Sequence, residues 1–493
     1  MNHVSTYTAL TFAPVQGFIE RSRKLRDLYG SSFILSYLAC SLCDDARDSG
    51  CEVISPALIN VTQGTPNQII LGGSYDYSRS RKTLLSSWKK ILITCRSWIE
   101  QAIPASYCWN RDWELWGSHA WEFFWGQGKD IASARQAVNA QKRCRDWTGV
   151  NWSGESSTLS GADSIAWPGL GRKLSQQQRD LTAEKEEITA FFTALHHKVG
   201  ALIDPSEQLS IPELTKRLIH FEPIERDLGL TAVDRPAKFQ EINRFEENQW
   251  TGWFQGDGDQ IGEYLQRLKI DTDAESAALN HFSTAMRQWG YNLSHFLPKT
   301  DGHSDGLIIY AGGDDFLGVL YRVNTTNPLS AEDCLNWWYH FPEQVWQQHG
   351  HEITVSVGFV WAGPAVPQRD ILQHCHEAEQ AAKTWGRNRL ALRILFNSGT
   401  YLQWVCPWQF LGILKDYRDR DGGHNWNHFY EDVNVLQNRH AFPDHFVALE
   451  LIDIYFPNWK PLLAQHQAMI LKPQVTLSQW VIDLAQVGFH LCS

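Results

Sequence analysis

The chain has 493 residues, with 55 acidic and 44 basic side chains and a formal net charge of −11. This balance argues against a free-standing nucleic-acid-binding protein, which normally carries a basic surface. No segment has the roughly 18 uninterrupted apolar residues that a membrane span needs. Ten irregularly spaced cysteines, with no signal-peptide pattern at the N-terminus, favour free thiols and a cytoplasmic protein.

The N-terminal part predicts a strand followed by a long helix. An apolar run from Leu10 reaches Pro14, and a helical pattern continues to Ala39 in LTFAPVQGFIERSRKLRDLYGSSFILSYLA. Four basic residues on this helix are most simply a solvated face, although contact with RNA phosphates or a nucleotide is an alternative. They are Arg21, Arg23, Lys24 and Arg26.

A polar segment follows the N-terminal part. Its stretch SGESSTLSGADS is rich in residues that break regular structure, and RDLTAEKEEITAFFTALHHKVGAL then shows helical periodicity. Cys144 lies in this region without a neighbouring CxxC pair, so a structural zinc site is doubtful. We therefore expect a helical link.

An acidic region follows the helical link and begins with a strand and a turn. Trp250–Gln255 reads as a strand that runs into the turn Gly256–Asp259, which places Asp257 at the end of the strand. A helical pattern starts near Gln260, and a longer one covers Thr272–Phe296. The apolar face of the first of these helices is Ile261, Tyr264, Leu265 and Leu268.

The stretch YAGGDDFLGVL, Tyr310–Leu320, predicts a hairpin with Asp314 and Asp315 at its corner. Alone it could be an ordinary solvated turn. The expected elements after it are a helix, a strand, a helix and a strand, over Ala331–His349, Glu352–Trp361, Arg369–Arg387 and Leu390–Phe396. The resulting order β-α-β-β-α-β is that of a ferredoxin-like sheet, in which Asp257 and the Asp314–Asp315 pair can meet at one edge.

Three neighbouring carboxylates raise at least one pKa unless cations are present. Mg²⁺ favours such oxygen ligands, and two ions roughly 3.5–4 Å apart would serve nucleotidyl transfer. In AAKTWGRNRL, Lys383 and Arg387 are four residues apart on the predicted helix and would share a face, where an anionic partner would relieve their repulsion. The alternative is that both residues cap the helix C-terminus.

The motifs GDGD, GGDD and AxKxxGRN resemble the palm domain of nucleotide cyclases and of GGDEF diguanylate cyclases. Leu10–Ala39 and TPNQIILGG, Thr65–Gly73, extend the likeness to the large palm-domain subunit of type III CRISPR-Cas surveillance complexes, Cmr/Csm type. The resemblance implies a cyclic oligoadenylate synthetase that joins ATP molecules when target RNA pairs with the guide.

The resemblance also assigns roles to residues. Asp257 and Asp314 would be metal ligands for two Mg²⁺ or Mn²⁺ ions, assisted by the Gly258 carbonyl, and Asp315 would be a ligand or assist the 3′-hydroxyl. Lys383 and Arg387 would hold the donor triphosphate of ATP. Gly312 and Gly313 are expected to line the nucleotide, and Ser356 and Gly358 to lie under its ribose or base.

The expected fold is α+β, with two ferredoxin-like (βαββαβ) palm domains at 1–140 and 241–400. A helical linking domain would occupy 141–240 and a helical C-terminal domain 401–493. The first palm should be non-catalytic, because QIILGG runs into Ser74-Tyr75 rather than an acidic pair. The chain begins almost directly in this palm and has no His-Asp dipeptide, so the nuclease (HD) domain of many family members is not expected.

The implied partners are the backbone and small subunits of the effector complex, the guide RNA, the target RNA and ATP, with no membrane contact. Two alternatives stay open. One is a stand-alone palm-domain cyclase that needs no guide RNA, and the other is a catalytically silent scaffold subunit.

Overall fold

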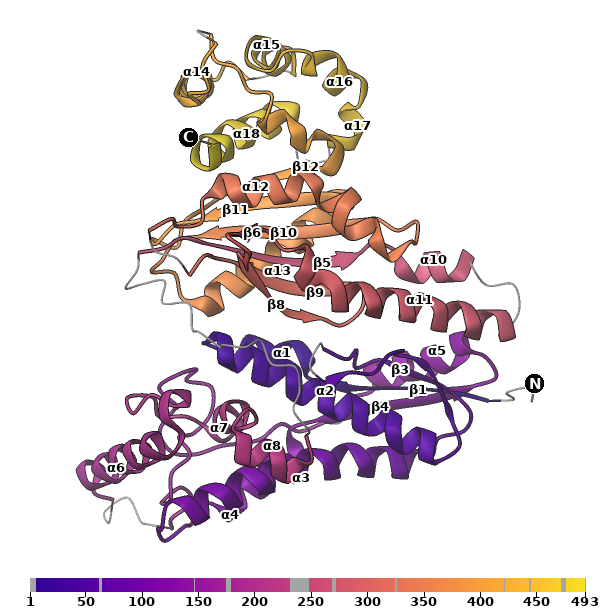
Figure 1. Ribbon diagram of the computed structural model, residues 1–493, viewed down its shortest axis with the longest axis vertical. Helices are drawn as coiled ribbons and strands as arrows, with labels where there is room; N and C mark the ends of the chain where they lie inside the picture. The colour runs from indigo at the N-terminus through magenta and orange to yellow at the C-terminus, as the bar shows by residue number, and fades with distance from the viewer. Residues whose placement is uncertain are drawn as a thin grey trace. The chain divides into compact units, whose positions relative to one another are not determined.

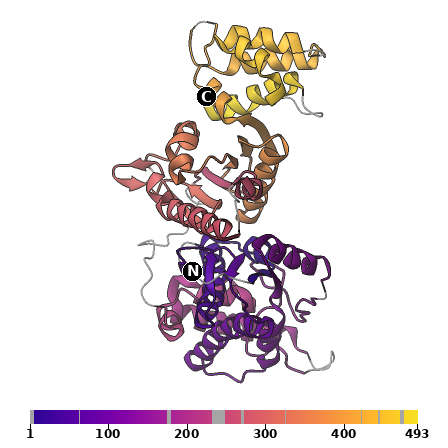
Figure 2. The ribbon, with the colours of Figure 1, turned by 90° about the vertical axis from the view of Figure 1, so that its right-hand side faces the viewer.

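The computed structural model describes residues 6–61, 64–145, 147–173, 179–230, 248–267, 272–323, 326–420, 422–442, 445–470 and 476–492. The chain forms two compact units, Met1–Glu241 with Arg267–Arg287, and Ile242–Gln266 with Gln288–Ser493 (Figures 1 and 2). Within the described residues no helix is long and apolar enough to cross a membrane. Leu268, predicted on a helix face, lies outside them.

The first unit contains a four-stranded sheet in the order β2-β3-β1-β4. Its strands are β1 (Tyr7–Ala13), β2 (Glu52–Ser55), β3 (Ile69–Gly72) and β4 (Glu122–Gly128). Helices α1 (Val15–Glu20) and α2 (Leu25–Asp48) connect β1 to β2, and α3 (Tyr77–Ala102) and α4 (Asn110–His119) connect β3 to β4. Strand β1 pairs antiparallel with β3 and β4, so the unit has the expected βαββαβ order.

The helices after this sheet belong to the same unit, and those beyond residue 180 share its hydrophobic core. They are α5 (Ile131–Arg143), α6 (Leu181–Val199), the 3₁₀ turn η3 (Gly200–Leu202), α7 (Ile211–Leu218) and α8 (Glu222–Leu228). Phe192 of α6 and Leu214 of α7 are buried in one hydrophobic cluster with Leu10 of β1. Buried Arg217 of α7 pairs with Asp27 of α2. The boundary at residue 140 stays a prediction, because apolar packing runs continuously across it.

The second unit is built on a six-stranded sheet in the order β12-β11-β10-β5-β9-β8. Its strands are β5 (Thr251–Gly258), β8 (Gly306–Ala311), β9 (Asp315–Leu320), β10 (Val355–Ala362), β11 (Arg389–Leu395) and β12 (Tyr401–Pro407). The sequence predicts helix from residue 401, whereas this segment begins with edge strand β12, because its alternating residues pair with β11.

Helices connect these strands in the predicted order. They are α10 (Ile261–Arg267), α11 (Thr272–Asn292), α12 (Ala331–His340) and α13 (Gln368–Thr384). Short elements complete the connections: η4 (Leu293–Phe296), β6 (Lys299–Thr300), β7 (His303–Ser304), η5 (Phe341–Val345) and η6 (Trp346–His349). The strands β10-β5-β9-β8 with their connections form a second βαββαβ arrangement, which confirms the predicted α+β fold.

The two faces of the second sheet differ in character because successive side chains of a strand alternate between them. On one face Phe254 packs against Phe316 and Trp338, at ring-centroid distances of 6.2 and 5.4 Å. On the other, a Cβ at Gly358 would lie 2.3 Å from the backbone nitrogen of Glu379 in α13. Glycine at this position therefore lets α13 approach the sheet, which explains Gly358 without a nucleotide.

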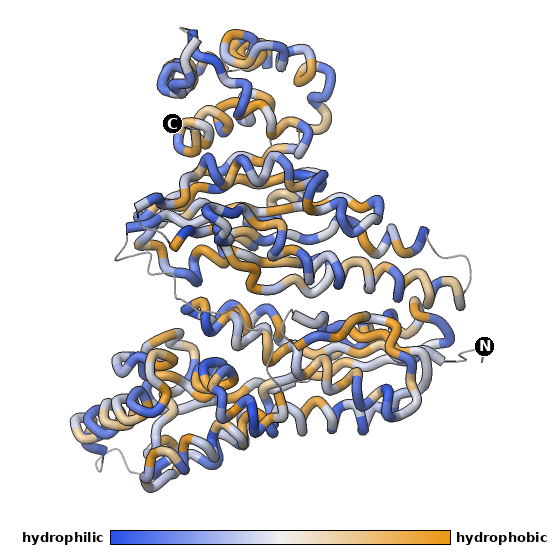
Figure 3. Tube along the Cα trace, in the orientation of Figure 1, coloured by the Kyte–Doolittle hydropathy of each residue, from blue (hydrophilic) through white to orange (hydrophobic). Residues whose placement is uncertain are grey.

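The C-terminal part is helical beyond the 3₁₀ segment η7 (Trp408–Leu414). Its helices are α14 (Asn427–Asn438), α15 (His445–Tyr455), α16 (Trp459–Gln465), α17 (Gln467–Ile470) and α18 (Leu477–Cys492). Helix α18 packs on β12, where the Trp480 indole N–H donates to the Val405 carbonyl oxygen over 3.0 Å. Figure 3 shows apolar stretches in the strands of both sheets.

Candidate active site

The three aspartates predicted at the turn and strand end come together at one edge of the second sheet. Asp315, the first residue of β9, is the antiparallel partner of Asp257 in β5. Asp314 precedes it in the β8–β9 turn, and its carbonyl oxygen accepts a hydrogen bond of 3.0 Å from the Gly258 N–H. This backbone bond fixes the turn against the end of β5.

Glycines make this close approach possible. A Cβ at Gly258 would lie 2.9 Å from Cδ1 of Ile261 and 3.1 Å from Cβ of Asp314. In the turn itself the Gly312 N–H donates to the Asp315 carbonyl oxygen over 3.2 Å. Gly312 is buried and Gly313 is half-buried. The glycines thus set the position of the acidic side chains.

The carboxylates disfavour each other's charge. Burial, and then the charges of Asp315 and Asp257, raise the pKa of Asp314. Desolvation at the turn, followed by the charge of Asp257, raises the pKa of Asp315, although this residue is itself exposed, and burial raises the pKa of Asp257 against the opposing effect of Lys383. The ionised cluster is therefore costly in the free protein, and added positive charge would stabilise it.

Lys383 is the cation that contacts this cluster. Its Nζ lies 2.5 Å from Oδ2 of Asp257 and 2.5 Å from Oε1 of Glu379, one turn earlier on α13. Burial lowers the pKa of Lys383, but the two carboxylates outweigh it, so the net shift is upward and the ammonium stays charged. The structure thus brings Lys383 into contact with the acidic cluster, and its role in binding phosphate stays a prediction.

Arg387 does not share a helix face with Lys383, so that part of the sequence argument is wrong. Helix α13 ends at Thr384, and the backbone then turns left-handed, with φ of 128° at Gly386, 63° at Arg387 and 51° at Asn388. The Arg387 side chain is exposed and forms no ion pair within the part of the chain that the structure describes. Gly386 is the sequence signal for this stop, since glycine commonly ends helices.

Ser356 and Asp259 bond each other rather than facing solvent. The Ser356 hydroxyl, fully buried, donates to Oδ1 of Asp259 over 2.6 Å. The other carboxylate oxygen of Asp259 accepts from the Thr354 hydroxyl at 2.8 Å and from the Asn388 N–H at 2.9 Å. Asp259 therefore ties the end of β5 to β10 and to the loop that carries Arg387, and the hydroxyl of Ser356 is committed within the protein.

Two neighbours of the aspartates escape sequence reasoning. Glu379 is only 2% exposed and pairs with Lys383. The other is Tyr310 of β8, because burial and then the charges of Asp315, Asp257 and Glu379 raise the pKa of its hydroxyl well above the usual value. The i, i+4 spacing of Glu379 and Lys383 is a signal in the sequence, but the same spacing is common on exposed helix surfaces.

The fit to divalent ions follows from these charges. No three His, Cys, Asp or Glu side chains form a ready metal cage anywhere in the described ranges. Mg²⁺, however, is usually held by one or two carboxylates together with substrate phosphates and water. Because Asp257, Asp314 and Asp315 repel one another, a divalent ion that arrives with its nucleotide would relieve that repulsion.

The first unit's counterpart of the aspartate-bearing β8–β9 turn does not lie where the sequence predicts it. The hairpin equivalent to β8–β9 is β2–β3, so the segment to compare is the one that joins β2 to β3, of which the structure describes 56–61 and 64–68, and not Ser74-Tyr75 after β3. By sequence that segment contains no Asp or Glu. Its Asn67 side chain donates to the Thr11 hydroxyl at 2.8 Å and the Phe12 carbonyl at 3.0 Å, which joins the turn to β1 with neutral groups.

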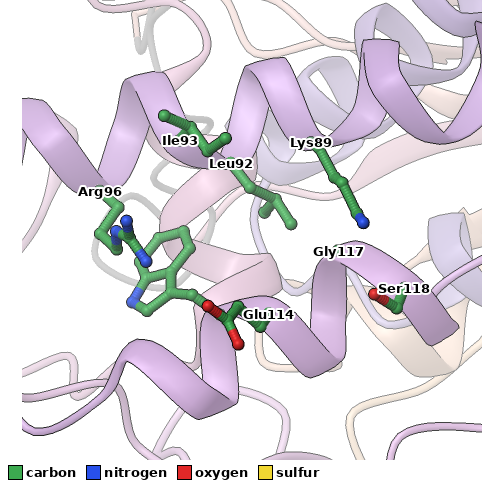
Figure 4. A pocket seen from close by; sticks show the side chains of 8 residues that line it. Lys89, Leu92, Ile93, Arg96, Glu114, Gly117 and Ser118 are labelled. Carbon is green, nitrogen blue, oxygen red and sulfur yellow. The ribbon is translucent and has the colours of Figure 1, made fainter.

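A pocket in the first unit lies between α3 and α4 (Figure 4). Leu92 and Ile93 contribute apolar surface, and Arg96 and Glu114 contribute charge of opposite sign. None of the predicted site residues lines it. It offers no arrangement of acids and bases comparable to the aspartate cluster.

Two family models match parts of the chain. The family described as "Cas10/Cmr2, second palm domain" matches residues 251–391, and "CRISPR-associated protein Cmr2, N-terminal" matches residues 7–67. The first of these ranges contains every predicted site residue. Comparison with curated proteins finds no match.

Solved structures resemble the chain over nearly its whole length. A type III-B Cmr-beta structure in the apo state superposes with a TM-score of 0.59 at 11% identity, covering 98% of this chain and 81% of the other. A Csm1–Csm4 cassette with AMPPNP gives 0.53 at 14% identity, covering 100% and 70%. The same cassette with cA3 gives 0.51 at 13%, again covering 100% and 70%. These matches establish the fold.

Proposed function

The chain belongs to the Cas10/Cmr2 family of type III CRISPR large subunits, and on that premise we propose that it synthesises cyclic oligoadenylate from ATP when target RNA pairs with the guide. The observation that carries the proposal is the geometry at the sheet edge. Asp315 lies opposite Asp257, Asp314 is bonded to Gly258 through its backbone, and Lys383 contacts Asp257.

Asp257 and Asp314 would hold the divalent ions, Mg²⁺ or Mn²⁺, with the Gly258 carbonyl as a further ligand. Two such ions, when bound, would activate the attacking hydroxyl and stabilise the leaving oxygen. Asp315 would complete the ligand set or accept the proton of the 3′-hydroxyl.

The remaining groups would bind ATP. Lys383 would contact the donor triphosphate from α13, and Arg387 would do so from the loop after the helix. Gly312 and Gly313 would allow the nucleotide close to the backbone. Ser356 would act indirectly, since its hydroxyl bonds Asp259, which in turn holds the loop of Arg387.

The partners would be the other effector subunits and, through them, the guide and target RNA. The matched structures are of Cmr-beta and Csm1–Csm4 assemblies, and a net charge of −11 suits a chain that meets RNA beside more basic subunits. The Csm1–Csm4 structures with AMPPNP and cA3 support ATP as the substrate and a cyclic oligoadenylate as the product.

The test is product formation from labelled ATP by the purified complex with Mg²⁺ or Mn²⁺, with and without matching target RNA. The variant Asp314→Ala with Asp315→Ala is assayed beside it, and assembly is checked by size. We expect cyclic product only with target RNA and intact aspartates. Product without guide and target RNA would favour a stand-alone cyclase, and no product from an assembled complex would favour a silent scaffold.

A further inference from the structure

Lys383 bridges two carboxylates that differ in their surroundings. Asp257, at the strand end, has 30% of its side chain exposed, whereas the side chain of Glu379 is 2% exposed. Both carboxylates lie 2.5 Å from the same ammonium. One partner therefore lies in the site open to ions, and the other lies beneath it, against the sheet.

Glu379 is held firmly in its place. Its backbone nitrogen would lie 2.3 Å from a Cβ on Gly358, so at this residue α13 touches β10. Its second oxygen, Oε2, accepts a hydrogen bond of 3.0 Å from Gln380 and lies 3.8 Å from Nδ1 of His376. A buried carboxylate is costly without a charged partner, and Lys383 supplies the nearest full positive charge.

We infer that Glu379 is a positioning residue that retains Lys383 at the site when Asp257 turns to a divalent ion. In the free protein the ammonium would occupy part of the space of the ion and neutralise Asp257. On binding of metal and nucleotide, Lys383 would leave Asp257, stay paired with Glu379 and meet the triphosphate. The second half of this inference rests on the proposed function.

Substitutions of Lys383 and Glu379 should therefore change the affinity for Mn²⁺ in opposite directions. Lys383→Met removes the cation that competes for Asp257, so Mn²⁺ should bind more tightly in the absence of nucleotide. Glu379→Gln leaves Lys383 with Asp257 alone, so Mn²⁺ should bind more weakly. In the Lys383→Met background the second substitution should have little effect, because Glu379 acts through the lysine.

A matched control separates this coupling from a general loss of charge. Glu377→Gln removes one negative charge from the same helix, but Glu377 pairs with Arg393, at 2.8 Å, rather than with Lys383.

Stability offers a second readout. Lys383→Met leaves Glu379 buried and unpaired and should lower the urea midpoint, and adding Glu379→Gln should restore part of it.

The experiment is titration of the full chain with Mn²⁺ without nucleotide, followed by electron paramagnetic resonance, for the wild type, both single variants, the double variant and Glu377→Gln. We expect Glu379→Gln to weaken binding about fivefold and Lys383→Met to tighten it by a similar factor, with strong non-additivity. In the assembled complex with target RNA and ATP, the KM of Glu379→Gln should rise more than its kcat falls.

The outcomes separate the two claims. Equal effects of Glu379→Gln with and without Lys383, or an effect no larger than that of Glu377→Gln, would overturn the positioning role while leaving the metal site intact. Absence of Mn²⁺ binding to the folded wild-type chain, alone and with ATP, would overturn both this inference and the proposed function.

Discussion

Replacing Asp314 by asparagine should stabilise the free protein while it abolishes synthesis. The fold raises the pKa of this carboxyl from 3.8 to about 7, first through burial and then through Asp315 and Asp257. A group whose folded pKa is raised disfavours the folded state once it ionises, so its cost grows as the pH rises from about 4 to about 7. The neutral amide of the substituted side chain does not incur this cost.

The magnitude follows from the same values. A displacement of the pKa from 3.8 to about 7 corresponds to about 4 kcal/mol when the carboxyl is fully ionised. The side chain is partly exposed, and solvent screening reduces the gain to about 1–2 kcal/mol at pH 8. At pH 5 the gain should shrink to less than about half, because the unfolded chain is then only about one unit above its own pKa.

The assay is urea unfolding of the full chain at pH 8 and pH 5, with Asp314→Asn compared with the wild type. Asp301→Asn is the control, since Asp301 is an exposed turn residue whose positive φ of 51° also suits asparagine. Mn²⁺ should raise the midpoint of the wild type more than that of Asp314→Asn. Equal stability at both pH values, or a loss like that of an ordinary core change, would refute this account of the cluster.

Three further substitutions test separate parts of the structure. Gly258→Ala would place a Cβ 3.1 Å from that of Asp314 and 2.9 Å from Cδ1 of Ile261. Mn²⁺ binding and synthesis should therefore fall about tenfold or more, with the far-ultraviolet circular dichroism spectrum unchanged. Wild-type Mn²⁺ binding and synthesis in this variant would show that the turn tolerates the shift. Arg387→Ala should raise the KM for ATP about tenfold and leave nucleotide-free Mn²⁺ binding unchanged, and an unchanged KM would remove Arg387 from the triphosphate site. Arg217→Ala leaves buried Asp27 without its cation and should cost about 3–5 kcal/mol in urea unfolding; a cost below about 1 kcal/mol would show that water replaces the pair.

The sequence predicts well what depends on local order along the chain. The strand that runs into Asp257 and the glycines of the hairpin are enough to place three aspartates at one sheet edge, because βαββαβ order brings these strands together. The end of α13 at Thr384 is also indicated locally, by Gly386, but the helix predicted over Arg369–Arg387 runs past it.

What depends on packing between distant segments is not predicted. The burial of Glu379 arises from the contact of α13 with Gly358, which no helical periodicity reveals. The hydroxyl of Ser356 is directed inward by Asp259, a residue nearly a hundred positions earlier in the chain. Strand β2 lacks a clear apolar alternation, so the turn between β2 and β3 is assigned to the wrong place by sequence alone.

The most direct test of the account is the location of metal and triphosphate. Crystals of the chain with Mn²⁺ and a non-hydrolysable ATP analogue would show manganese by its anomalous scattering. The account predicts manganese between Asp257 and Asp314, with the triphosphate against Lys383 and the lysine still paired with Glu379. Manganese elsewhere, or a triphosphate bound away from α13, would contradict the assignment of this sheet edge as the centre of nucleotidyl transfer.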